Sequence, residues 1–189
     1  MLRKQLGFLF DTNRCLGCRT CITACAEEKG LPIGVYLRNV ELHELRKGAQ
    51  IIKYYLSTAC NHCSNPECFR LCPEHALRKR RDGIVLLNEE RCTGCGICVR
   101  GCPFKGVAMN TLTGKAVKCD LCQEKLDEKK LPVCVAACPV EALRLIDISE
   151  VESRNLDIVR RLPGVAKIQI TRPAIRYLPL RYGKQVLRL

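Results

Sequence analysis

The sequence contains no tryptophan and few aromatic side chains of any kind. Aromatic residues make up 5% of its 189 residues, although hydrophobic residues together reach 47%. Aromatic side chains bury the largest areas in most protein cores, so this chain lacks a major source of folding free energy. We therefore expect that a bound group contributes much of its stability.

Long apolar runs are missing as well. Residues Met1–Phe10 (MLRKQLGFLF) include two basic side chains and only a short apolar stretch before Asp11, whereas a secretory signal needs about 7–15 apolar residues. No segment approaches the roughly 18 apolar residues of a membrane span. We expect a soluble chain, cytoplasmic or peripheral on either side of a membrane as part of a complex. Its thiols should be reduced or metal-bound.

Cysteine is the residue that the sequence has in abundance. The chain has 16 cysteines in 189 residues, above the roughly 8% that marks a scaffold built on cysteine. They form four groups of four with none left over, and a proline follows the last cysteine of groups two, three and four. Group one is Cys15, Cys18, Cys21 and Cys25; group two is Cys60, Cys63, Cys68 and Cys72; group three is Cys92, Cys95, Cys98 and Cys102; group four is Cys119, Cys122, Cys134 and Cys138.

This spacing indicates iron–sulfur cubanes. A C-x2-C-x2-C loop wraps three corners of one [4Fe–4S] cluster, and the outlying fourth cysteine reaches a neighbouring cluster. Zinc instead takes its four ligands as separated pairs. We therefore predict four [4Fe–4S] clusters with all sixteen cysteines as ligands. Because fourth cysteines cross over, groups must pair. The short separation of groups two and three favours them as one ferredoxin-like half. Groups one and four would then form the other half around it.

The charge is strongly basic. The chain has 32 Lys or Arg against 19 Asp or Glu, a formal net charge of +13, and nine of the basic residues lie from Arg154 onward beside a single acid. Four cubanes with their thiolates would add about −8, so much of this charge can be counter-charge for clusters. Nucleic-acid binding would call for aromatic residues among the basic ones. The run Arg78–Arg81 has none and the C-terminal segment only Tyr177 and Tyr182, so we expect no nucleic-acid partner.

The residues between the groups predict a mixed α+β fold. The capping box Ser149-x-x-Glu152 predicts a helix that ends before Pro163, and Lys167–Leu189 shows no period and is expected to be an extended arm. The other predicted elements are strands over Leu6–Asp11 and Ala142–Ile148, a hairpin within Ala76–Leu87 that turns at Asp82-Gly83, and short helices over Arg19–Lys29 and Cys119–Lys130.

The chain resembles the four-cluster iron–sulfur subunit of dimethyl-sulfoxide-reductase-type molybdenum oxidoreductases, the second subunit of a three-part respiratory complex. Two departures are Ala26, where the family pattern suggests proline, and a loop over 26–59 that looks short. The matching segments cover nearly the whole chain: GFLFDTNRCLGCRTCITAC (7–25), YYLSTACNHCSNPECFRLCP (54–73), RDGIVLLNEERCTGCGICVRGCP (81–103), KCDLCQEKL (118–126), PVCVAACPVEAL (132–143) and LPGVAKIQITRPAIRYLP (162–179).

The resemblance implies a fold and a set of ligands. It implies two interleaved bacterial-ferredoxin-like halves, an outer one from 1–59 and 104–153 and an inserted one from 60–103, with a basic partner-binding arm over 154–189. Cys95 is present where some relatives build a [3Fe–4S] centre, so four [4Fe–4S] clusters are expected. The implied ligand sets are Cys15, Cys18, Cys21 and Cys138 (site A, nearest the catalytic subunit); Cys25, Cys119, Cys122 and Cys134 (site B); Cys60, Cys63, Cys68 and Cys102 (site C); and Cys72, Cys92, Cys95 and Cys98 (site D).

The function that the resemblance implies is electron relay. The partners would be a molybdopterin (molybdenum or tungsten) catalytic subunit at one end and a membrane quinol-oxidising subunit, a ferredoxin or a flavoprotein at the other. The alternative is a dissociable polyferredoxin serving a soluble hydrogenase, formate dehydrogenase or tungsten aldehyde oxidoreductase. Because every cysteine is used as a ligand, no open iron site remains and we expect no enzyme activity in this chain. His62, inside the second group, is expected to be a hydrogen-bonding residue and not a ligand.

Overall fold

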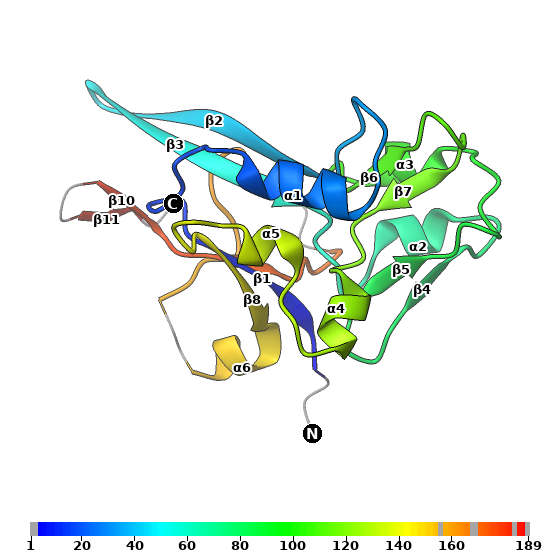
Figure 1. Cartoon of the computed structure of the whole chain (residues 1–189). Helices are drawn as coiled ribbons and strands as arrows, with labels where there is room; N and C mark the ends of the chain where they lie inside the picture. The colour runs from blue at the N-terminus through cyan, green and yellow to red at the C-terminus, as the bar shows by residue number, and fades with distance from the viewer. Residues whose placement is uncertain (1–3, 155–156, 167–169, 183–184, 188–189) are drawn as a thin grey trace.

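A computed structural model of the chain describes residues 4–154, 157–166, 170–182 and 185–187. It has the mixed α+β character that the sequence predicts, with short helices between short strands (Figure 1). The elements are β1 (Leu6–Phe10), α1 (Thr20–Glu28), β2 (Arg38–Lys47), β3 (Gln50–Ala59), α2 (Glu67–Leu71), β4 (Leu77–Lys79), β5 (Val85–Leu87), α3 (Ile97–Gly101), β6 (Val107–Met109), β7 (Ala116–Lys118), α4 (Gln123–Asp127), α5 (Val133–Ala136), β8 (Leu143–Asp147), α6 (Ile148–Ser153), β9 (Ile175–Tyr177), β10 (Leu180–Tyr182) and β11 (Gln185–Leu187).

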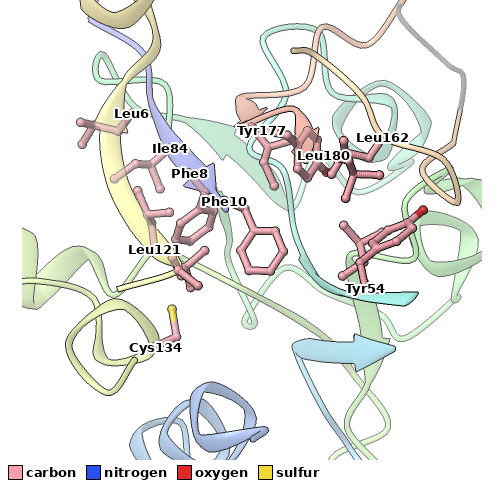
Figure 2. Close-up of a cluster of buried hydrophobic side chains, with 14 of the residues drawn as sticks. Leu6, Phe8, Phe10, Tyr54, Ile84, Leu121, Cys134, Leu162, Tyr177 and Leu180 are labelled. Atoms are coloured by element: carbon pink, nitrogen blue, oxygen red, sulfur yellow. The ribbon is translucent and has the colours of Figure 1, made fainter. Parts of the chain in front are cut away.

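Strand β1 is the centre of the main sheet. Its sequence LGFLF is a continuous apolar run, which suits a strand buried on both faces, and all five residues are buried. It pairs with β8 in antiparallel orientation and with β9 in parallel orientation, so the strand order is β8-β1-β9. Phe8 and Phe10 of β1 lie near Leu121 and Tyr177 in the larger hydrophobic cluster, and Cys134 lies at its edge (Figure 2). The main hydrophobic core therefore includes Cys134, one of the predicted ligands.

A second, smaller cluster lies beside the two short hairpins β4–β5 and β6–β7. These hairpins and helices α2 and α3 gather on the right of Figure 1, away from the main sheet. The cluster is built from side chains of small or medium size: Cys68, Leu77, Val85, Cys98, Val107 and Ala116. The predicted hairpin at Asp82-Gly83 is confirmed, with Gly83 at a φ of 87°. The division of the chain into an outer half (1–59 and 104–153) and an inserted half (60–103) stays a prediction. Strands β6 and β7 pack in this smaller cluster, although they lie outside 60–103.

No element was predicted for residues 30–59, where the structure has the long hairpin β2–β3. Ten residues of β2 pair with ten of β3 across Gly48, whose φ of 61° suits a tight two-residue turn. Tyr54 and Leu56 are buried near the base, whereas most residues at the tip are exposed. Figure 1 shows the hairpin projecting from the molecule at the upper left. A half-exposed hairpin gives a weak alternation of polar and apolar residues, which explains the omission.

Two of the predicted helices differ from those observed. The helix that was expected to start at Ser149 and run toward Pro163 is the short α6, which ends at Ser153. Its cap is Asp147, whose carboxylate accepts a hydrogen bond from the Ser149 amide at 3.0 Å. The Ser149 amide, which a capping box would direct to Glu152, thus donates to Asp147, and the Glu152 carboxylate pairs with Arg176. The helix predicted over Cys119–Lys130 is confirmed only as the short α4, while strands β1 and β8 and helix α1 are confirmed.

The structure does not show the predicted basic arm over 154–189. Part of it lies outside the described residues, and β9 in the described part belongs to the main sheet. Just before β9, the Arg172 and Thr171 carbonyls accept hydrogen bonds from the Ser64 and Asn65 amides, and the Ala174 amide donates to the Asn61 carbonyl. The segment therefore joins β1 to the loop of cysteine group two.

The pairing of β1 with β9 should be disrupted by a side chain at Gly7. A Cβ atom there would lie 1.9 Å from the Ala174 carbonyl oxygen, which accepts a hydrogen bond from the Phe8 amide. We expect Gly7→Ala to push β9 from β1 and to destabilise the protein by about 3 kcal/mol. Gly30→Ala is the control, because it enters open space and adds only about 1 kcal/mol of backbone strain. Thermal unfolding followed by circular dichroism compares the two; equal losses would contradict the expectation.

Candidate metal centre

The four cysteine groups share one local backbone feature. In each, the second residue after the first cysteine has a left-handed backbone: Gly17, His62, Gly94 and Leu121, with φ between 41° and 74°. Such a conformation costs a non-glycine residue about 1–2 kcal/mol, so its occurrence at His62 and Leu121 shows that the turn itself is required. The C-x2-C pairs therefore form four copies of the same turn.

The fourth cysteines of groups two, three and four share a second feature. Cys72, Cys102 and Cys138 each accept a hydrogen bond on Sγ, at 3.3 Å, from the amide four residues later. The proline that follows each of these cysteines cannot donate a backbone hydrogen bond and turns the chain away from the preceding helix. An amide that donates to a ligand sulfur also raises the reduction potential of a cluster.

Cys25 differs because it lies inside a helix. Ala26 follows it in place of proline, and α1 continues through Cys25 to Glu28. The Cys25 carbonyl accepts a helical hydrogen bond from the Lys29 amide. The departure from the family pattern therefore lengthens one helix without moving its cysteine out of the interior, where Cys25 is buried.

Three cavities are each lined by four cysteines from two different groups. The first is lined by the cysteines of site B, the second by those of site D and the third by those of site C. In site A, the charge of Cys15 interacts with those of Cys18, Cys21 and Cys138. The structure thus brings together the members of all four predicted sets, although the assignment of each cysteine to a cluster stays a prediction.

Several of the buried thiols in these sites are poorly suited to carry negative charge alone. Burial raises the pKa of Cys63 and Cys68 to about 12 and that of Cys25 to about 11. The pKa of Cys119, which is also buried, is raised well above its ordinary value for the same reason. Thiolates at neutral pH therefore need a cationic partner inside each cavity. Iron bound to these sulfurs would supply that charge and release the thiol protons.

The donors present fit [4Fe–4S] clusters. All sixteen cysteines are free thiols, and among the described residues no three His, Cys, Asp or Glu side chains converge on a position for a single ion. The cysteines instead surround spaces, as ligands of a cube must. His62 is completely buried, and its Nδ1 accepts a hydrogen bond from the Val85 amide at 3.1 Å. The prediction that His62 forms a hydrogen bond is confirmed.

The basic run Arg78–Arg81 is only partly exposed to solvent. Arg80 pairs with Asp82 and Asp127, and Lys79 donates to the Cys63 carbonyl at 2.8 Å. Arg38, a buried cation, lies between cysteine groups one and two in a stretch without a motif, so no sequence signal marked it.

Comparisons with known proteins agree with this site. Residues 51–148 match a family model described as a 4Fe-4S dicluster domain, and residues 8–31 match a 4Fe-4S binding domain. The sequence is 36% identical over 185 residues to one of the chains of the anaerobic dimethyl sulfoxide reductase of Escherichia coli strain K12, covering 93% of this chain and 89% of that one. This protein belongs to the same family of iron–sulfur subunits.

Other members are similar over the same range. One of the subunits of the tetrathionate reductase of Salmonella typhimurium is 34% identical over 94% of this chain and 74% of its own length. Protein NrfC of Escherichia coli strain K12 is 32% identical over 95% and 83%. As a member of this family, the chain is a [4Fe–4S] electron-transfer subunit with ferredoxin-like α+β units, and it is not a catalytic subunit. None of the helices in the described part of the chain has the length and hydropathy of a membrane span.

Proposed function

We propose that the chain relays single electrons along the sites in the order A, B, C, D. The observation that carries this order is the exposure of the cysteines. Cys18 of site A and Cys95 of site D are exposed, whereas all four cysteines of site B and three of the four of site C are buried. Two interior sites between two surface sites form a path through the protein with one opening at each end.

The contacts between sites support the same order. Cys21 of site A interacts electrostatically with Cys134 of site B, and Cys119 of site B interacts with Cys60 of site C. Sites C and D share cysteine groups two and three. When bound, the clusters supply one-electron oxidation and reduction. The chain's own residues position the sulfurs, donate amide hydrogen bonds to them and keep water from the interior sites.

Exposed apolar side chains lie at both ends of the path. Leu16, between Cys15 and Cys18, is 66% exposed, and Leu112 is 81% exposed. Leu112 lies in the turn before Gly114, whose carbonyl closely approaches Gly94 in the cysteine loop of site D. Exposed apolar groups beside a redox centre suit a protein partner. The end at site A would receive a molybdopterin catalytic subunit, and the end at site D a membrane quinol-oxidising subunit, a ferredoxin or a flavoprotein.

The proposed architecture follows from the ligand sets. Sites A and B would belong to the outer ferredoxin-like half and sites C and D to the inserted half. Groups one and four would together supply sites A and B, and groups two and three would supply sites C and D. The inserted half would therefore interrupt the outer half along the sequence. Such a chain would sit in a reductase complex that is cytoplasmic or peripheral on a membrane.

Metal content of the native complex tests this function. We expect about sixteen irons per chain from four cubanes, together with about one molybdenum or tungsten from a catalytic partner. The measurement is elemental mass spectrometry on protein purified anaerobically at low salt. Iron without molybdenum or tungsten would favour the dissociable polyferredoxin. Zinc in place of iron would overturn the relay.

A further inference from the structure

Two of the three buried cations in the described residues lack a carboxylate partner. Buried Lys and Arg side chains belong to Arg38, Lys118 and Arg176. Arg176 pairs with Glu152, whereas no Asp or Glu side chain in the described part of the chain forms an ion pair with Arg38 or Lys118. An uncompensated buried charge is strongly unfavourable. Both positions therefore require negative charge from another source.

Arg38 lies between sites A and B. It is 3% exposed and lines the cavity of site B with that site's four cysteines. Its Nη1 donates to the Ser57 hydroxyl at 3.0 Å, and that hydroxyl lies 3.8 Å from Sγ of Cys21 in site A. The guanidinium stacks over the Phe8 ring at 4.7 Å, and its Nη2 is buried without a hydrogen-bond partner. One nitrogen thus faces the interior with its donor capacity unused.

The surrounding thiolates account for the charge of Arg38. Burial alone lowers the pKa of the guanidinium, but the negative charges of Cys134, Cys119, Cys21 and Cys25 outweigh burial and raise it. Three of these cysteines belong to site B and one to site A. The cation is placed where it interacts with both sites.

Lys118 has the corresponding position between sites B and C. It is 5% exposed, and its Nζ donates to the Cys119 carbonyl at 2.7 Å and to the Val85 carbonyl. Cys119 lines the cavity of site B, and Val85 lines the cavity of site C with that site's four cysteines. Both of its identified acceptors are neutral carbonyls, so the negative charge must again come from cluster ligands.

We propose that Arg38 and Lys118 are positioning residues for charge, one at the A–B junction and one at the B–C junction of the relay. Each stabilises an added electron on either of its two neighbouring clusters. The reduction potentials of the two clusters at a junction therefore rise together, and an electron is not trapped on one side. The inference rests on the proposed ligand sets and deepens the proposed relay by assigning residues that control its potentials.

The test compares charge-removing and charge-keeping variants of the native complex. Arg38→Met and Lys118→Met remove the charge, while Arg38→Lys and Lys118→Arg keep it. Redox titration monitored by electron paramagnetic resonance measures each cluster. We expect Arg38→Met to lower the reduction equilibrium constants of A and B about tenfold, which is 59 mV for a one-electron couple. Lys118→Met should lower those of B and C by the same factor. Site D, which neither cation adjoins, should not change.

The results for these variants test the role of Arg38 and Lys118 separately from the proposed relay. Unchanged potentials in both Met variants with full iron content would overturn the inference and leave the relay intact. Iron lost from the adjoining sites in a Met variant but kept in its charge-keeping partner would support the inference, because charge is then needed for assembly. Equal iron loss in both variants at a position would overturn it in favour of a shape requirement. Fewer than four cubanes in the unaltered chain would instead refute the proposed function.

Discussion

Replacing Cys25 with alanine is expected to damage the cluster of site B and to spare site A, although Cys25 belongs to the same sequence group as three ligands of site A. The reason is the placement of Cys25 in α1, from which it lines the cavity of Cys119, Cys122 and Cys134. Loss of the fourth sulfur should remove between one and four of about sixteen irons. It should also reduce electron transfer between the two ends by at least about 100-fold.

Cys138→Ala is the matched variant, because Cys138 belongs to sequence group four but is assigned to site A. It should damage site A and spare site B, because Cys138 interacts with Cys15 and Cys21 and not with the cavity of site B. Iron analysis and electron paramagnetic resonance of both variants distinguish the two clusters. If Cys25→Ala removed the same spectroscopic signal as Cys18→Ala, ligands would follow sequence groups and the crossed assignment would be wrong.

Removing the iron should unfold the chain. Bound metal contributes on the order of 10 kcal/mol per structural site in small metal-dependent domains, which is comparable to the whole stability of an ordinary domain. Here the interior sites are lined by cysteines such as Cys25, Cys63 and Cys68, whose pKa values burial raises. The hydrophobic cluster around Cys68 and Cys98 has no aromatic side chain. The cavities would be left open and the surrounding hairpins without support.

Chelation of iron under anaerobic conditions, followed by far-ultraviolet circular dichroism and hydrogen exchange, measures this dependence. We expect cooperative loss of secondary structure. Amides of β4–β7 should exchange before those of β1, which is supported by the aromatic cluster of Phe8, Phe10 and Tyr177. Recovery of the native spectrum after addition of iron and sulfide is the control for irreversible damage. A chain that kept its native spectrum without iron would show that the apolar core suffices.

Local patterns predicted part of the fold correctly. The apolar run of β1, the Asp82-Gly83 turn and the helix around Cys21 each depend on neighbouring residues, so their sequence signals are strong. The cap of α6 was predicted two residues too late in the sequence, because Asp147 is both the end of β8 and the acceptor for the Ser149 amide. Nothing local distinguishes an aspartate that ends a strand from a serine that starts a helix two residues later.

The place of β9 was not predictable from its own residues. A three-residue strand between Pro173 and Pro179 shows no usable period. It is held by pairing with β1, which lies more than a hundred residues away in the sequence. The same contact explains why the C-terminal segment that was expected to be an arm instead joins the main sheet to the loop of group two.

The sequence by itself determined the chemistry: sixteen cysteines at cubane spacing, their family and their relay function. Ligand spacing is a local property, because each loop must follow the corners of one cluster whatever surrounds it. The family resemblance had implied the four ligand sets, and tertiary structure showed that the cysteines of sites B, C and D line common cavities. Tertiary structure alone decided which sites open to the surface. It also placed Arg38 and Lys118 between the sites. Burial and charge depend on contacts between distant segments, and in a low-dielectric interior those contacts decide where a cation is stable.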